Sequence, residues 1–170
     1  RDRRLNTSGG GPAILRNAEF VKGLPDLAAK DWQKVKRANE FVEFTLNSAR
    51  EGARQGIGEV IENPARSWFW EFPAAKHLQL EDSWQSVRYD SCAWAGSRCK
   101  AQLLQTNMDE MQAVTASCHH WHSKAEWQRK TINGKATFVT KGEAEYTAEL
   151  AFAIAVAMSW WAVRVGRAKL

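Results

Sequence analysis

The stretch Gly56–Trp70 reads GIGEVIENPARSWFW, and the predicted fold depends on it. Two glycines precede a short β-branched run and Asn63-Pro64 follows it, so residues 59–61 are expected to form a buried central strand. Asn63 would cap a helix that begins at Pro64, because proline has no N–H to leave unsatisfied at that position. Glu62 would then lie at the carboxyl end of a strand beside a helix N-terminus, where open α/β sheets bind ligands. The alternative is that Glu62 is a solvated loop residue.

The composition is that of one globular domain. The chain has 170 residues, of which 44% are hydrophobic and 25% charged, and these values permit a single core and exclude wholesale disorder. The nine tryptophans require a large core or a partner surface, because Trp is rarely fully buried and is enriched at interfaces. The net charge of +5 permits attraction to nucleic acid or to an acidic partner.

The three cysteines are an odd number, which argues against a secreted disulfide framework. We therefore expect an intracellular protein, in the nucleus or an organelle. Arg1–Leu5 contains no apolar segment and is not a signal peptide, so further residues are expected upstream. Residues 1–24 are basic and rich in Gly and Ser, as in an arm or linker, and residues 25–170 are expected to form one domain.

Hydrophobic periodicity predicts the other elements. Apolar spacings of three and four predict a helix from Pro25 to Arg54. The helix at Pro64 is expected to end before Pro73. Further strands are expected at residues 86–92, 101–106, 113–117 and 136–140, with a long loop at residues 118–135. This order of helix, buried strand, helix and shorter strands favours a mostly parallel α/β fold.

The last helix, expected from Glu145 to Val165, is apolar almost all round. Its uncharged part, Leu150 to Val163, is shorter than the roughly 18 to 20 residues that a membrane span needs. A core or interface helix is therefore favoured over membrane contact.

Cys118, His120 and His122 are the candidate metal ligands. A thiolate and two imidazoles this close in sequence could supply three ligands, with Cys92 or Cys99 as a fourth. The spacing matches no zinc-ribbon or zinc-finger pattern, and the chain contains no CxxC motif. We therefore expect loop residues here, with no metal and no other cofactor.

Basic and aromatic side chains supply candidate contacts with partners. Basic residues at helical spacing could follow a phosphate backbone, although a solvated helix face is the commoner explanation. The candidates for nucleic-acid binding are Lys30, Lys34, Arg37, Arg66 and Lys100. The candidates for contact with a partner protein are Trp68, Trp70, Trp160 and Trp161.

An ordered set of motifs resembles the later half of divergent DNA cytosine-5 methyltransferase-like domains, of the kind found in mobile-element reading frames of protists. The likeness covers residues 12 to about 158. Its motifs are GLP at 23–25, KRAN at 36–39, VIENPARSWFW at 60–70, AGSRCK at 95–100, TN at 106–107, CHHWH at 118–122 and GEAEYTAEL at 142–150. The resemblance implies a partial Rossmann-like, layered sheet with flanking helices, followed here by a long C-terminal apolar helix.

The resemblance also implies roles for two residues. In the family, a glutamate in the Glu-Asn motif donates a proton to the cytosine ring, and an arginine from a later motif orients the base. Glu62 matches the glutamate and Arg98 is the nearest match to the arginine. The base must leave the duplex to reach such a site.

Two parts of the family's machinery have no match in this chain. A cysteine after Pro-Pro attacks the ring in the family, and a glycine-rich turn binds S-adenosylmethionine; both would lie before residue 1. Cys92, Cys99 and Cys118 have no Pro-Pro context. We therefore expect a catalytically incomplete methyltransferase-like domain, not an enzyme on its own.

Such a domain is expected to act as a binding or scaffold subunit within a larger assembly, with a protein or nucleic-acid partner. One alternative is the C-terminal portion of an active DNA (cytosine-5) methyltransferase whose upstream half binds S-adenosylmethionine. The other is a nucleic-acid-binding module of mobile-element origin.

Overall fold

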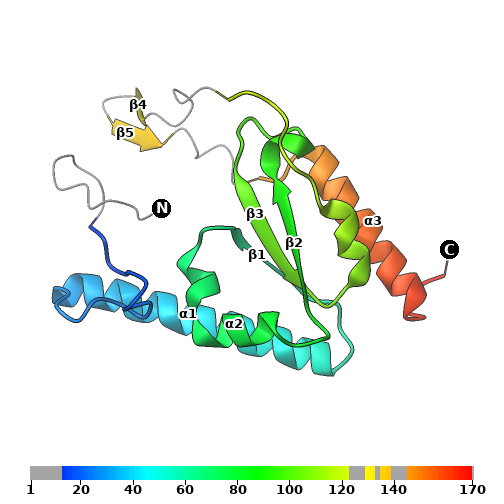
Figure 1. Cartoon of the computed structure of the whole chain (residues 1–170), viewed down its shortest axis with the longest axis horizontal. Helices are drawn as coiled ribbons and strands as arrows, with labels where there is room; N and C mark the ends of the chain where they lie inside the picture. Colours follow the sequence, from blue (N-terminus) through cyan, green and yellow to red (C-terminus); the bar gives the residue numbers. More distant parts are fainter. Residues whose placement is uncertain (1–12, 123–128, 133–134, 139–144, 170) are drawn as a thin grey trace.

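A three-stranded antiparallel sheet forms the centre of the structure (Figure 1). The computed structural model describes residues 13–122, 129–132, 135–138 and 145–169. The strands of the sheet are β1 (Val60–Pro64), β2 (Gln85–Asp90) and β3 (Ala101–Thr106). β3 lies in the middle and pairs antiparallel with both neighbours. β1 and β2 therefore run parallel to each other without being adjacent.

Helices precede, connect and follow the strands. The α-helices are α1 (Ala29–Arg54), α2 (Pro73–Gln79) and α3 (Ala148–Arg164). The short 3-10 helices are η1 (Trp68–Glu71), η2 (Ser91–Trp94) and η3 (Asp109–Val114). A separate two-stranded hairpin consists of β4 (Arg129–Ile132) and β5 (Lys135–Phe138).

One hydrophobic cluster joins α1, α2 and the sheet. Leu46 and Ala49 of α1 pack with Ile61 of β1 and Leu78 of α2. Aromatic residues from the segment between β1 and β2 complete this cluster: Phe69, Trp70, Phe72 and Trp84. Arg16, upstream of α1, also contacts the helix, since its guanidinium donates to Asn39 Oδ1 at 2.7 Å.

A second hydrophobic cluster joins the sheet to α3 and η3. Leu104 of β3 and Val87 of β2 pack there with Leu150 of α3. The preceding residue, Leu103, packs against the first cluster instead, as expected because neighbouring side chains of a strand point to opposite faces. Both faces of the sheet are therefore covered, which explains why short strands are stable here.

The expected Rossmann-like parallel sheet is wrong. The chain does contain a strand, helical segment and strand in succession, β1, α2 and β2, and these two strands are parallel. However, β3 lies between them and runs the opposite way. The sequence order of the elements is thus typical of a parallel sheet, whereas the pairing is entirely antiparallel.

The expected helix start at Asn63-Pro64 is also wrong, because both residues belong to β1. β1 is an edge strand, where proline's missing N–H removes no hydrogen bond that the sheet needs. The cap is Ser67 instead, whose Oγ accepts a hydrogen bond from Phe69 N at 3.2 Å and starts η1. Pro73 begins α2 at a position that suits proline. Glu62 consequently lies in the middle of a strand.

The C-terminal helix is shorter than expected. α3 has 17 residues, begins after Thr147, whose Oγ1 accepts from Leu150 N at 3.3 Å, and ends at Arg164. Arg164 donates to Glu110 of η3 at 2.5 and 3.1 Å. The expected long apolar helix is therefore corrected to one of ordinary length. Among the described residues, no helix has the length and apolar character required to cross a membrane.

The strand expected at residues 113–117 reduces to one bridge, in which Ala116 pairs in parallel with Tyr89. The expected loop at residues 118–135 contains β4 within its described part. By contrast, the strand at residues 101–106 is confirmed to the residue. The helix expected from Pro25 to Arg54 is confirmed at its end but begins at Ala29, and the strand expected at residues 86–92 overlaps β2.

Candidate binding pocket and metal centre

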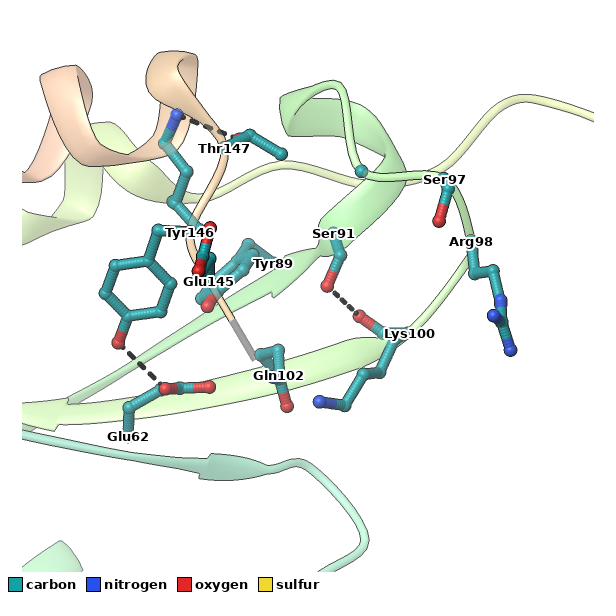
Figure 2. A pocket seen from close by; sticks show the side chains of 12 residues that line it. Glu62, Tyr89, Ser91, Ser97, Arg98, Lys100, Gln102, Glu145, Tyr146 and Thr147 are labelled. Carbon is teal, nitrogen blue, oxygen red and sulfur yellow. Dashed lines mark hydrogen bonds between the residues drawn. The ribbon is translucent and has the colours of Figure 1, made fainter. Parts of the chain in front are cut away.

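A small cavity of about 240 Å³ lies beside the sheet (Figure 2). Glu62 reaches it from β1, Gln102 from β3, and Tyr146 from the segment before α3. The loop between β2 and β3 supplies Ser97, Arg98 and Lys100. Residues far apart in sequence thus line one site, because the antiparallel pairing brings β1 and the β2–β3 loop together.

Two tyrosines face the carboxylate of Glu62. Tyr146 donates its hydroxyl to Glu62 Oε2 at 2.8 Å, as Figure 2 shows. Burial, together with the hydrogen bond to Glu62, raises the pKa of Tyr146 to about 12. Burial and then the charge of Glu62 also raise the pKa of Tyr89. Both phenols therefore stay protonated at neutral pH, and the hydroxyl proton of Tyr146 is committed to Glu62.

Gln102 adds a buried acceptor to the cavity. Its side chain is 6% exposed, and Oε1 has no hydrogen-bond partner within the described part of the chain. Leaving a buried polar atom unsatisfied costs about 1 to 3 kcal/mol. Such an atom in the wall of a cavity is suited to a ligand that brings an N–H or O–H donor.

The two residues predicted to act on a base, Glu62 and Arg98, line this same cavity from different walls. Glu62 comes from β1, and Arg98, which is 6% exposed, comes from the β2–β3 loop. The structure therefore brings together a pair that lies 36 positions apart in the sequence. Gln102, Tyr89 and Tyr146 were not predicted.

An open groove of about 840 Å³ runs along α1 and β1 and shares Glu62 with the cavity. Arg37 and Phe41 line it from α1, and Arg66 and Trp68 line it from the segment after β1. Phe41 is 74% exposed. The groove thus combines guanidinium groups with accessible aromatic rings.

Three of the five residues predicted to bind nucleic acid line the groove or the cavity, and two lie elsewhere. Arg37 and Arg66 line the groove, and Lys100 lines the cavity. Lys34 instead forms an ion pair with Asp31 at 2.6 Å. Lys30 lies exposed on the first turn of α1 and lines neither surface.

The four tryptophans predicted to contact a partner differ in their positions. Trp70 is a core residue, and its Nε1 donates to the Pro64 carbonyl oxygen at 3.0 Å. Trp68 lines the groove. On α3, Trp160 is exposed, whereas the half-buried ring of Trp161 lies 5.8 Å from the guanidinium carbon of Arg167.

Four residues whose side chains can bind a metal lie close together beside the β2–β3 loop. Cys92 lies in η2, Cys99 lies just before β3, and Cys118 and His122 follow the bridge to β2. Their ligand atoms all lie within 4.8 Å of one another. The expectation that no metal would be bound rested on the absence of a known ligand set, and the structure corrects it, because this cluster could hold an ion.

The composition of the predicted ligand set also changes. His120 is exposed, with Nδ1 4.0 Å from Cys118 Sγ, and does not belong to the cluster. Cys92 and Cys99 both belong to it, whereas the sequence suggested one or the other. The predicted strands at residues 86–92 and 101–106 contained the missing signal, since pairing them as a hairpin places these two cysteines near each other.

The three thiols of the cluster differ in acidity. Burial raises the pKa of Cys92 to about 12, and it raises the pKa of Cys99 as well. The backbone N–H of His120, which donates to Cys118 Sγ at 3.4 Å, is the main cause that lowers the pKa of Cys118 to about 6. Among the three thiols, that of Cys118 is therefore the most readily ionised.

Comparisons of the chain with protein-family models, with curated proteins and with solved structures find no match. The resemblance to cytosine-5 methyltransferase-like domains therefore stays a prediction. The partners of the chain and its intracellular localisation stay predictions as well.

Proposed function

We propose that this chain is a nucleic-acid-binding module that holds one unpaired base in the cavity at Glu62 and performs no chemistry on it. It would be a catalytically incomplete counterpart of the methyltransferase-like domains that its motifs resemble. The observation that carries the proposal is the position of Glu62, which lines both the polar cavity and the basic, aromatic groove.

The size and polarity of the cavity suit a single base. Pockets for drug-sized ligands span about 300 to 1,000 Å³, and this cavity, of about 240 Å³, lies below that range. A pyrimidine presents both donors and acceptors on its Watson–Crick edge. Glu62 and Gln102 offer acceptors for an exocyclic amine, and Lys100 offers donors.

The groove suits the strand on either side of that base. Proteins that bind single strands combine cations, which follow the phosphates, with aromatic rings, on which bases stack. Arg37 and Arg66 supply the charges, and Phe41 and Trp68 supply the rings. Since the groove and the cavity meet at Glu62, a strand in the groove could turn one base into the cavity.

Binding without methylation is supported by the positions of the cysteines. All three lie in the cluster with His122, and within the described part of the chain none of them lines the cavity. A base held at Glu62 therefore meets no thiol nucleophile from these residues. Methyl transfer by this chain together with S-adenosylmethionine alone would contradict the proposal and favour an active methyltransferase.

Arg37→Ala is expected to weaken binding of a single-stranded oligonucleotide several-fold. Loss of one phosphate contact should also reduce the slope of log K against log salt by about 0.7 to 1. Fluorescence anisotropy titrations at several salt concentrations measure both quantities. Arg54→Ala is the matched control, because Arg54 lies exposed on the same helix, outside the groove and about 25 Å along the axis from Arg37. An equal effect of the two substitutions would show that the groove is not the binding surface.

A protein partner is the second candidate, and it is favoured by one feature of α3. Phe152, Val156 and Trp160 lie four positions apart and are all exposed, so they form an apolar stripe along one side of the helix. Such a stripe supports assembly with another subunit. Association through it would be insensitive to salt, unlike nucleic-acid binding.

A further inference from the structure

We propose that Cys92, Cys99, Cys118 and His122 bind a structural Zn²⁺ ion, and that this ion fixes the loop that forms one wall of the cavity. Three thiolates and one imidazole form a complete ligand set for zinc, which favours sulfur and nitrogen ligands in tetrahedral geometry. Four protein ligands leave no open position for a reacting water, so the site is structural.

The distances in the cluster fit this ion. A tetrahedral Zn²⁺ with bonds of about 2.3 Å to sulfur and about 2.0 Å to nitrogen separates its ligand atoms by about 3.5 to 3.8 Å. The ligand atoms here all lie within 4.8 Å of one another, and Cys118 Sγ lies 3.1 Å from His122 Nε2. Shifts of an ångström or less in side-chain positions would complete the geometry.

The backbone holds the ligands close together before any ion binds. Ser91 N donates to the Lys100 carbonyl oxygen at 2.9 Å, which closes the loop that carries Cys92 and Cys99. Asp90 holds the segment that carries Cys118 and His122. Its N–H donates to the Ala116 carbonyl oxygen and its Oδ2 accepts from Cys118 N, each at 2.9 Å. The ligands thus come from three segments that are already joined by hydrogen bonds.

A tight turn at Gly96 helps to bring Cys92 and Cys99 together. Gly96 N donates to the Ser91 carbonyl oxygen at 2.9 Å. A Cβ at Gly96 would lie 2.6 Å from that same oxygen, which is a backbone atom and cannot easily move. The preceding residue, Ala95, has a φ of 61°, an uncommon backbone conformation for a residue other than glycine. The backbone is therefore strained at Ala95, where the loop turns back toward Cys99.

The N–H···S hydrogen bond from His120 supports the site independently of the ligand distances. Its donor is a backbone amide, and its acceptor is Cys118 Sγ. Bonds of this kind stabilise a thiolate and orient it toward a metal. Zinc binds cysteine as the thiolate, so the affinity for zinc should rise with pH.

The same loop links the ion to the cavity. Arg98 and Lys100 flank Cys99, and Ser97 lies one residue further back. All three line the cavity, and Figure 2 shows them following one another along the loop. Fixing Cys92 and Cys99 to one ion would hold this wall in place. The zinc site stands by itself, and its effect on oligonucleotide binding rests on the proposed function.

Metal analysis of purified protein, together with the visible spectrum of its Co²⁺ form, tests the site. One equivalent of zinc per chain is expected, and Co²⁺ should give the intense bands of a tetrahedral site with thiolate ligands. His122→Ala should lower zinc affinity by more than about 100-fold, since losing an outer-shell partner alone costs about 10- to 100-fold. His122→Cys should restore binding with a changed Co²⁺ spectrum.

His120→Ala is the matched control, because His120 lies beside Cys118 outside the ligand set. It should retain stoichiometric zinc. The site is refuted if protein purified with zinc binds no equivalent of the ion, or if His120→Ala reduces affinity as much as His122→Ala. Circular dichroism of each variant establishes that the sheet is intact.

Oligonucleotide titrations of zinc-loaded and chelated protein test the link to the cavity. Chelation should weaken binding by about tenfold while the far-ultraviolet spectrum keeps its helical signal. Equal affinity of the two forms would refute the link and leave both the zinc site and the proposed function standing. No binding by the zinc-loaded form would instead refute the proposed function and leave the zinc site standing.

Discussion

Trp70→Ala is expected to lower the free energy of unfolding by about 3 to 5 kcal/mol, the usual cost of truncating a buried Trp or Phe. Trp70 is 6% exposed and packs edge to face on Phe69, with ring centroids 4.8 Å apart. The substitution also removes the hydrogen bond to the Pro64 carbonyl oxygen. Because single domains have only about 5 to 15 kcal/mol of stability, a measurable unfolded fraction is expected in urea titrations followed by circular dichroism.

Trp160→Ala is the control for this prediction, since it removes the same side chain from an exposed position on α3. Its effect on stability should stay within about 0.5 to 1 kcal/mol. The reverse order of effects would mean that Trp160 is the core residue and that the packing around η1 is wrong. Trp160→Ala should also release a protein partner bound to the apolar stripe of α3.

Leu104→Ala is expected to cost about 2 to 5 kcal/mol, the range for buried Leu truncations. Leu104 is fully buried on the central strand β3, between Val87 of β2 and the helix α3. Its removal leaves a cavity between the sheet and α3. The shift of the urea midpoint at constant m-value measures the loss.

Leu80→Ala provides the comparison, because Leu80 is 83% exposed at the end of α2. Almost no change in stability is expected for it. A small effect of Leu104→Ala would indicate that β3 does not lie at the centre of the sheet, and the antiparallel arrangement would then have to be abandoned.

Much of the secondary structure was predictable from local patterns. The spacing of apolar residues located α1, and the β-rich run at residues 101–106 located β3. Strand pairing was not predictable in the same way, because the order β1, α2, β2 is compatible with adjacent parallel strands. The partner of each strand depends on which faces are buried by distant helices. Asn63-Pro64 was misread for a related reason, since the signal for a helix start is also acceptable at an edge strand.

The candidate site was predictable in part. The resemblance pointed to Glu62 and Arg98, and the structure places both at one cavity. Gln102 carries no signal in sequence, because its role depends on burial and on an amide oxygen left without a partner among the described residues. The metal cluster was predicted only in part, because its ligands are spread over three segments. The β2–β3 hairpin brings Cys92 close to Cys99, and the bridge between Tyr89 and Ala116 brings Cys118 close to both.

The central claim is that the cavity at Glu62 receives a base, and a strand of abasic sugar-phosphate units carrying a single cytosine tests it most directly. The protein should bind this strand about tenfold more tightly than the fully abasic strand, since good contacts to a base edge contribute about 1 to 3 kcal/mol. Glu62→Ala should remove this preference without weakening binding of the abasic strand. Equal affinity of the wild-type protein for the two strands, or a preference that survives Glu62→Ala, would contradict the claim.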